Sequence, residues 1–519
     1  MEGGANRSSP GALRQTRTSH GWKEVSEEAA VTTFTFVLAG EAAAPDNVAN
    51  FRRSADGFGS ISRIVVASAA TPLESDEINA LVASASSDFV CIIDKPGKLN
   101  AALFEHFERF IAAHSESAVV YGDETQRGES SDHELVAKPI FSPERLRCQY
   151  YWGNPVFYRS GFFSEIGGLD SALPGAELYD LALRAARSGA EVGHIHEILF
   201  EGSGPALLGP ESSVGLESTR SALQSHLDAT GGGEVRSVNS SGIHDTRRVV
   251  KGEPLVSIVI PTRGIYQVVD NATKCFVVDA VASILEKSTY TNIEIVLVID
   301  AVADPKAITE LDALAGERIT YVQWDRPFNF SEKVNHGVLA ASGDFVLILN
   351  DDVEVITPDW IQSMLALAQL PGAGMVGGML YYEDDTIQHA GHAYWEGDAS
   401  HIGLDTPRGD AGPLGGYLVE REVVGVTAAC ALMPKSVFVE VGGFSHLLPG
   451  NFNDVDLCMK TTWRGFTIYW TPHAELYHFE SKTRDATVRG FEVDITWSRW
   501  GFRMHDARYW PYPLSRPPR

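Results

Sequence analysis

This 519-residue sequence has few cysteines, no long apolar runs and a shortage of basic side chains. Its cysteines, at positions 91, 148, 275, 430 and 458, are scattered and include no Cys-x-x-Cys pair. A disulfide framework or a zinc ribbon is therefore disfavoured, and a reducing cytosol fits best. We expect Cys91, Cys430 and Cys458, which stand in apolar stretches, to be core residues.

No apolar run approaches the roughly 18 to 20 residues of a membrane-spanning helix, and the N-terminus shows no apolar signal-peptide segment. We therefore expect a cytoplasmic protein. Acidic residues number 68 against 42 basic ones, a net charge of −26. Such a surface repels phosphate backbones and argues against a nucleic-acid partner. A phosphorylated ligand would need a cation or a local basic spot.

The pattern along the chain predicts a polar, disordered leader and two domains. The leader is residues 1–28, and strand-like patterning begins at 33–38. A Gly- and Ser-rich stretch at 230–245 resembles a linker. We place the first domain at 29–247 and the second, with a C-terminal extension, at 248–519.

In the second half, short Val- and Ile-rich runs alternate with helix-like segments. The strand-like runs are 255–260, 293–299, 319–322 and 345–349, and the helical segments are 279–286, 307–315 and 331–341. This alternation predicts a parallel sheet covered by helices on both faces. Ligands of such sheets bind beyond the carboxyl ends of the strands, so the residues after each run are the candidates.

The two halves also resemble each other in three collinear places. The matched segments are 84–96 with 340–352, 166–175 with 441–450, and 178–192 with 454–468. Three matches in one order indicate a duplication of one α/β domain.

Three groups in the second half could perform chemistry. Asn350, Asp351 and Asp352 follow a predicted strand and could bind Mg²⁺ or Mn²⁺ through oxygen atoms, although the same residues are common in polar turns. Asp454 could be a general base or merely cap a helix. His478 could be a metal ligand or an ordinary buried side chain.

The duplication helps to separate these alternatives. In the first half, Pro96, Leu178 and Glu201 stand where the second half has Asp352, Asp454 and His478. Asp456, in contrast, is retained as Asp180 and is therefore expected to be structural. Because the first copy lacks all three candidate groups, we expect them to serve chemistry rather than folding.

At this level the second half resembles a known family. Residues 254–515 are similar to glycosyltransferase family 2 of the bacterial polysaccharide, rhamnosyltransferase-like type. The resemblance rests on VSIVIPTRG (256–264), FNFSEKVNHGVLAASGDFVLILNDDVEV (328–355), TIQHAGHAYW (386–395) and FNDVDLCMKTTWRGFTIYWTPHAELYHFES (452–481). It implies an α/β fold class of two tandem nucleotide-diphospho-sugar transferase (GT-A, Rossmann-like) domains, the first degenerate.

The resemblance also implies roles for individual residues. Donor contacts would come from Pro261, Thr262, Arg263, Asp300, Lys333, Asn335, Asn350, Asp351 and Asp352. Asp454 would be the catalytic base, and Asp352 and His478 would bind Mg²⁺ or Mn²⁺. A Gln-x-x-Arg-Trp motif of processive synthases is only half present, with Thr496 before Arg499 and Trp500, so a polymer-extruding synthase is disfavoured.

Together these features predict a metal-dependent inverting glycosyltransferase of cell-surface polysaccharide synthesis. The donor would be a UDP-, dTDP- or GDP-linked sugar, and the acceptor a glycan or lipid-linked saccharide. Peripheral association with the inner membrane face and homo-oligomer formation both remain open. The first domain would be a scaffold, acceptor-binding or dimerisation module, in which Tyr150, Tyr151 and Trp152 either stack on sugars or, as we favour, belong to the core.

Two other functions stay open at this point. A non-catalytic carbohydrate-binding or assembly protein would tolerate loss of Asp352 or Asp454. A sugar nucleotidyltransferase would release diphosphate from a nucleoside triphosphate. Against nucleotide-binding enzymes of other types, the sequence has no Gly-x-Gly-x-x-Gly after a first strand and no Gly-x-x-x-x-Gly-Lys loop.

Overall fold

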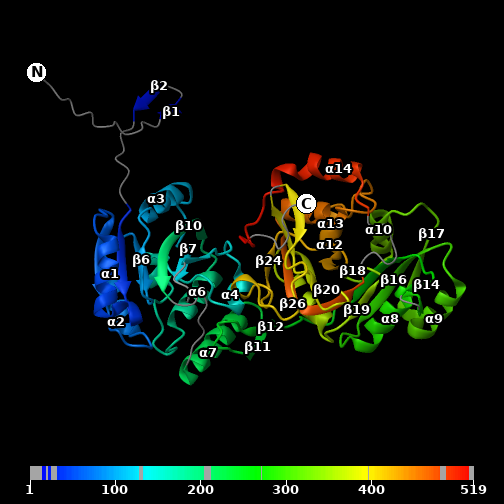
Figure 1. Cartoon of the computed structure of the whole chain (residues 1–519), viewed down its shortest axis with the longest axis horizontal. Coiled ribbons are helices and arrows are strands. Elements are labelled where there is room, and N and C mark those ends of the chain that lie inside the picture. Colours follow the sequence, from blue (N-terminus) through cyan, green and yellow to red (C-terminus); the bar gives the residue numbers. More distant parts are fainter. Residues whose placement is uncertain are drawn as a thin grey trace, which may run out of the picture.

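The computed structural model describes residues 15–18, 21–24, 32–127, 133–203, 212–269, 272–395, 397–479 and 487–512. Of the predicted leader it describes only β1 (Gln15–Thr18) and β2 (Gly21–Glu24), which pair antiparallel. Two large sheets follow, one in each half of the chain, and the halves lie side by side along the long axis of the molecule (Figure 1). Among the described residues, no helix is both long and apolar enough to span a bilayer.

The first sheet has seven strands in one path, with β8 (His133–Val136) added beside β7. In spatial order the path runs β4 (Ile61–Val66), β3 (Phe34–Leu38), β5 (Phe89–Ile93), β9 (Val156–Arg159), β7 (Val119–Arg127), β10 (Val192–Ser203) and β6 (Gly97–Leu99).

The second sheet repeats this order and adds one strand at its edge. In spatial order the path runs β17 (Ile319–Trp324), β16 (Ile293–Asp300), β13 (Val256–Thr262), β18 (Phe345–Leu349), β25 (Cys430–Pro434), β20 (Ala373–Tyr381), β26 (Thr467–His478) and β19 (Val353–Val355).

Each pair of neighbours within the shared part of the two sheets also has the same relative direction. β3 is parallel to β4 and β5, as β13 is to β16 and β18. β9 lies antiparallel between β5 and β7, as β25 lies between β18 and β20. This agreement supports the duplication, and the predicted α/β class with two tandem sheets is confirmed.

The four runs for which the sequence predicted a parallel sheet are β13, β16, β17 and β18, and this prediction is confirmed. These four strands form a continuous parallel block, whereas β25 and β19, which the sequence did not single out, run antiparallel to their neighbours. A buried antiparallel strand between two helix layers is as apolar as a parallel one, so hydrophobicity alone did not reveal its direction.

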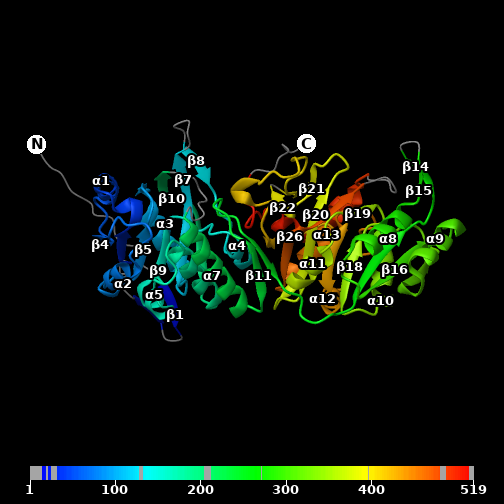
Figure 2. The same ribbon diagram turned by 90° about the horizontal axis from the view of Figure 1, so that it is seen from below.

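Helices cover both faces of each sheet (Figure 2). In the second half, α8 (Phe276–Lys287), α9 (Pro305–Ala315) and α11 (Trp360–Ala368) pack on one face, and α10 (Phe330–Ala340), α12 (Lys435–Glu440) and α13 (Asn453–Trp463) on the other. In the first half, α2 (Ser75–Ala83), α5 (Ser160–Glu165), α6 (Glu177–Arg187) and α7 (Ser213–Ala229) oppose α1 (Pro45–Ala55) and α3 (Leu103–Ala113).

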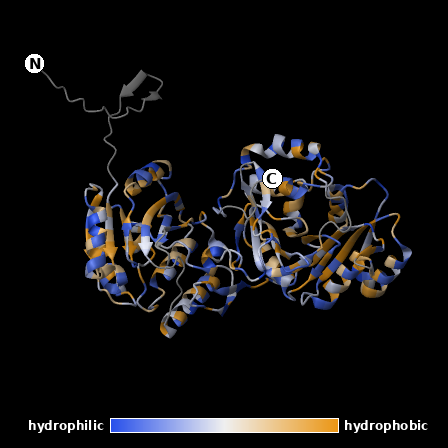
Figure 3. Cartoon of the chain, in the orientation of Figure 1, coloured by the Kyte–Doolittle hydropathy of each residue, from blue (hydrophilic) through white to orange (hydrophobic). Residues whose placement is uncertain are grey.

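The central strands of the sheets are strongly apolar (Figure 3), because strands such as β13 and β18 are buried on both faces. The expected core cysteines, Cys91, Cys430 and Cys458, are fully or almost fully buried. Tyr151 and Trp152 are also buried, which favours the core alternative for the aromatic strip.

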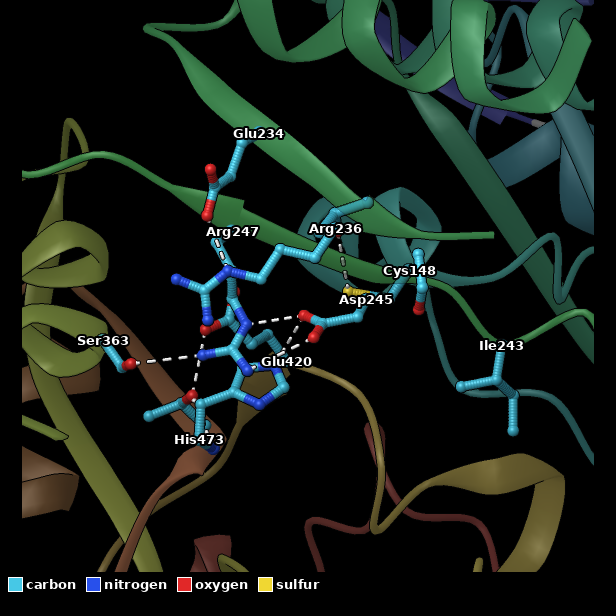
Figure 4. Close-up of polar contacts among 12 residues, drawn as sticks. Cys148, Glu234, Arg236, Ile243, Asp245, Arg247, Ser363, Glu420 and His473 are labelled. Carbon is cyan, nitrogen blue, oxygen red and sulfur yellow. Dashed lines mark hydrogen bonds and ion pairs between the residues drawn. The ribbon is translucent and has the colours of Figure 1, made fainter. Parts of the chain in front are cut away.

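The predicted linker at 230–245 is largely a structured hairpin at the junction of the halves. It pairs β11 (Gly233–Ser237) with β12 (Asp245–Arg248). Arg247 donates to Asp245 Oδ1 at 2.6 Å and to Ser363 Oγ, on α11 of the second half, at 3.4 Å (Figure 4). The exact division at residues 247 and 248 stays a prediction.

A buried charge network joins the halves near this hairpin. Arg147, in α4 (Pro143–Cys148), pairs with Glu420 of the second half and with Glu144 at 2.9 Å. Arg248 donates to Glu144 at 2.6 Å. Glu422 accepts hydrogen bonds from Ser142 Oγ and, at 3.3 Å, from the Glu144 amide. Burial and the nearby charge of Glu144 raise the pKa of Glu422 to about 7.

Candidate functional site

The candidate residues after β13, β16 and β18 meet at the carboxyl edge of the parallel block. Thr262 Oγ1 donates to Asp351 Oδ2 at 2.6 Å. Lys333 Nζ, from α10, donates to Asp300 Oδ1 at 2.6 Å and to the Thr262 carbonyl at 2.7 Å. Because these strands run the same way, their ends form one edge, as the sequence predicted.

A small cavity opens at this edge. Thr262, Arg263, Cys275, Phe276 and Asp351 are among the residues that line it. Arg263 is exposed, so its guanidinium supplies the local positive charge that an anionic ligand of this acidic protein requires. Pro261, one residue before Thr262, is buried inside β13, where only its carbonyl can form a hydrogen bond.

Asp352 and His478 lie side by side, although 126 positions apart in the chain, because β19 pairs with β26. Val353 stands directly opposite His478 in this antiparallel ladder. The Phe479 amide donates to the Asp352 carbonyl at 2.9 Å. As a result, Asp352 Oδ1 is 3.2 Å from His478 Nε2.

Hydrogen bonds assign the proton of His478 to the nitrogen that faces away from Asp352. His478 Nδ1 donates to Gln388 Oε1 at 2.7 Å, and Asn350 Nδ2 donates to His478 Nε2 at 2.9 Å. Nε2 therefore carries the lone pair, which accepts from Asn350 here and lies 3.2 Å from Asp352 Oδ1. This tautomer is the form of imidazole that binds metals, and a bound ion would take the place of the Asn350 hydrogen bond. Gln388 was not predicted from the sequence, because nothing in the pattern shows which side chain meets His478.

This donor pair fits a divalent cation. Two neighbouring ligands at about 2.1 Å in an octahedral site stand about 3 Å apart, and Asp352 and His478 are separated by 3.2 Å. The adjacent Asp351 is also buried, and burial together with the charge of Asp352 raises its pKa to about 7. A cation would stabilise both carboxylates in their ionised form.

Asp454 lies in the first turn of α13 and is only partly buried. It accepts hydrogen bonds from the Val455 amide at 2.8 Å and the Ala428 amide at 3.3 Å. The neighbouring Ala429 carbonyl accepts from the Asn350 amide at 3.0 Å, so two consecutive residues connect Asp454 to the Asn350 turn. Asp454, Asp352 and His478 thus share one edge of the sheet.

Two other residues named from the sequence are held by hydrogen bonds to distant parts of the chain. Asn335 uses its whole amide on the backbone of Phe444, donating to its carbonyl and accepting from its N–H, both at 2.9 Å. Asp456 is fully buried and accepts from Arg499 at 3.0 Å and Trp500 Nε1 at 2.9 Å, in agreement with its predicted structural role.

At the matching positions, all of which the structure describes, the first half has no equivalent set. In its β6–β10 ladder, Lys98 stands opposite Glu201 and pairs with it at 2.8 Å. Gly97 is the counterpart of Val353, the residue opposite His478 in the second half. Because Gly202 stands opposite Gly97, Gly202 is the closer structural equivalent of His478. In either alignment the first copy lacks an imidazole there.

The structure also brings together three histidines that the sequence reading did not single out: His389, His392 and His401. The spacing His-x-x-His within TIQHAGHAYW was a usable signal, but it predicts a cluster only if the backbone turns between the two residues.

Comparisons with known proteins show which family the second half resembles. Residues 257–442 match the family model described as Glycosyl transferase family 2. The chain is 32% identical over 450 residues to Uncharacterized protein y4gI of Sinorhizobium fredii, an alignment that covers 82% of this chain and 48% of that protein. It is 28% identical over 464 residues to O-antigen biosynthesis protein RfbC of Myxococcus xanthus, covering 87% and 35% respectively.

The chain therefore spans about half or less of the length of these two curated relatives. Among solved structures, GalNAc-T7 with UDP, GalNAc and Mn²⁺ aligns over 47% of this chain and 48% of its own, with 14% identity and a TM-score of 0.37.

Proposed function

We propose, from the match of residues 257–442 to glycosyl transferase family 2, that the chain is a metal-dependent, inverting glycosyltransferase. It transfers a sugar from a nucleoside diphosphate to a hydroxyl of a glycan or lipid-linked saccharide in polysaccharide synthesis. The observation that supports metal dependence most directly is the pair Asp352 and His478, 3.2 Å apart, with the proton of His478 on Nδ1 and its Nε2 on the side of Asp352.

Asp352 and His478 hold the divalent cation in this proposal, which is Mg²⁺ or Mn²⁺. The bound ion supplies positive charge to the leaving nucleoside diphosphate. Gln388 keeps the proton of His478 on Nδ1 and so keeps Nε2 available. Thr262 and Asn350 orient the two neighbouring groups, since each donates a hydrogen bond into the cluster.

Asp454 accepts the proton of the acceptor hydroxyl. Two amides and the first turn of α13 hold its carboxylate in place, and the side chain is only partly buried. As the proton moves to Asp454, the hydroxyl oxygen forms its bond to C1 of the sugar, and the bond from C1 to the diphosphate oxygen breaks with its electron pair. One displacement from the face opposite the leaving group inverts the anomeric carbon.

The donor edge is ordered before the nucleotide arrives. Lys333 is 1% exposed and ties the end of β13 to the end of β16 through Thr262 and Asp300. Arg263 and Phe276, which line the cavity beside it, supply charge and an apolar surface for the nucleotide. Asp300 contacts the base in this proposal.

A donor-hydrolysis and transfer screen tests the proposal. The purified full chain is offered a panel of UDP-, dTDP- and GDP-sugars with Mn²⁺, with Mg²⁺ or with a chelator. We expect nucleoside diphosphate to be released from one donor only when a divalent ion is present, and Asp352→Ala to abolish this release. Asp494→Asn, an exposed acid on α14 (Gly490–Trp500), is the matched control and should behave as wild type.

Release of diphosphate from a nucleoside triphosphate would instead indicate a nucleotidyltransferase. Donor turnover that is equal with and without chelator, and unchanged in Asp352→Ala, would contradict the metal-dependent mechanism.

A further inference from the structure

Three histidines converge on one side of the β21–β23 segment, outside the pair formed by Asp352 and His478. They end or begin short strands: β21 (Ile387–His389), β22 (His392–Trp395) and β23 (Asp398–His401). His392 and His401 are directly opposite each other in the β22–β23 hairpin, which brings their Cβ atoms to about 5 Å. Gly391 has a φ of +101°, a conformation that favours glycine, and it turns the chain so that His389 joins them.

The spacing of the three rings is that of ligands around one metal ion. Their centroids are 5.1 Å (His389–His392), 4.7 Å (His389–His401) and 5.1 Å (His392–His401) apart. Around a tetrahedral ion with metal–nitrogen bonds of about 2.05 Å, ligand atoms stand about 3.3 Å apart and ring centroids about 5 Å apart. His389 Nδ1 and His401 Nδ1 are 3.1 Å apart.

The hydrogen bonds of the cluster do not account for the protons of neutral rings. His389 Nε2 accepts from the Thr427 amide at 3.2 Å, which would leave the proton on Nδ1. His401 Nδ1 faces both His389 Nδ1 and the Gln388 carbonyl oxygen, each at 3.1 Å. With one proton on each ring, no choice of tautomers satisfies all three contacts.

His392 adds a second anomaly. It is 3% exposed, and its Nδ1 has no hydrogen-bond partner among the described residues. His389 is fully buried, so three imidazoles are grouped in a largely dry site. A buried polar group without a partner costs about 1–3 kcal/mol, and metal coordination would use these lone pairs.

We propose that His389, His392 and His401 bind one transition-metal ion of the Zn²⁺ class, separate from the ion at Asp352 and His478. Imidazole nitrogen favours Zn²⁺ over Mg²⁺, which prefers oxygen. The Gln388 carbonyl oxygen, 3.1 Å from His401 Nδ1, is positioned to complete the set. If His389 binds the ion through Nδ1, its proton moves to Nε2, which can then no longer accept from the Thr427 amide. At 3.2 Å this is the longest of the three contacts described above.

The proposed ion has a structural role in holding β21 to the β22–β23 hairpin. Gln388, the neighbour of His389 in β21, is the residue that orients His478. The histidine site would therefore stiffen the strand that positions a donor-metal ligand. Its existence does not depend on the proposed glycosyl transfer, because zinc binding is measured without any nucleotide sugar.

Zinc stoichiometry of the purified full chain tests the site. The protein is stripped with a chelator, titrated with Zn²⁺, passed through a desalting column and analysed for bound metal. We expect one tightly held equivalent in wild type and in Asp352→Ala. His401→Ala should weaken this binding at least about tenfold, and His446→Ala, an exposed histidine in the same half, should not change it.

Two further measurements guard against the case in which His401→Ala loses zinc only because it fails to fold. His401 is the least buried of the three, and His401→Gln gives a second, closer replacement with circular dichroism as the folding check. Co²⁺ added to stripped wild type should give the visible absorption of a tetrahedral site. Absence of tightly bound zinc in wild type, or equal binding in wild type, His389→Ala and His401→Ala, would overturn the proposal.

Discussion

The hydrogen bond between Gln388 and His478 gives a sharp test of the donor-metal site. Gln388→Met keeps the length and volume of the side chain but removes the oxygen that accepts the His478 Nδ1 proton at 2.7 Å. His478 is buried, so its N–H would lose its partner in a site with little water. An unsatisfied buried donor costs about 1–3 kcal/mol, which corresponds to a factor of roughly 5 to 150 in affinity.

Part of that cost is avoided if the ring changes its tautomer, but the proton then sits on Nε2 and competes with the metal. The free protein can escape the cost in this way, whereas the metal-bound protein must keep the proton on the unpartnered Nδ1, so we expect the dissociation constant for Mn²⁺ to rise about 10- to 100-fold. Turnover at saturating Mn²⁺ should change much less, because the ligands themselves remain.

The assay follows free Mn²⁺ by its electron paramagnetic resonance signal during titration of the full chain. Gln323→Met, an exposed residue of β17, is the matched control and should bind as wild type. An unchanged dissociation constant in a folded Gln388→Met protein would refute the view that this bond prepares His478 for a metal.

Three other predictions concern the base, the junction of the halves and the core. Asp454→Asn should lower the turnover number about 10²- to 10⁴-fold in steady-state kinetics, while a donor titration should show little change in donor affinity. Equal turnover in wild type and variant would refute the role of Asp454 as base. Burial raises the Glu422 pKa from 4.5 to about 7, so the free energy of unfolding should fall as the pH rises through this window. Glu422→Gln should remove that fall: in denaturant unfolding, the variant should be more stable than wild type by up to about 3 kcal/mol at pH 8 and no more stable at pH 4. Asp456→Ala should lower the free energy of unfolding by about 3 kcal/mol or more, because it leaves Arg499, Trp500 and Lys460 without their shared acceptor. Unfolding in urea measures this loss, and the control Asp494→Ala should unfold as wild type.

The sequence was sufficient for the positions of the main strands and the residues at their ends. The run at 345–349 is β18, and Asn350 to Asp352 follow it at the carboxyl edge of the sheet, because β-branched and apolar residues that are buried on both faces leave a continuous signal. The internal resemblance likewise predicted two copies of one domain. It also predicted that Asp456 is structural, because a folding requirement persists in both copies.

Only the tertiary structure decided how distant segments meet. The contact between Asp352 and His478 depends on the pairing of β19 with β26, and the proton on His478 depends on Gln388, from a third strand. The direction of β25 was equally hidden, since a strand buried on both faces has the same composition in either direction. The three histidines form a cluster because a glycine turn and a hairpin register put them on one side, and register is a property of paired strands rather than of either strand alone.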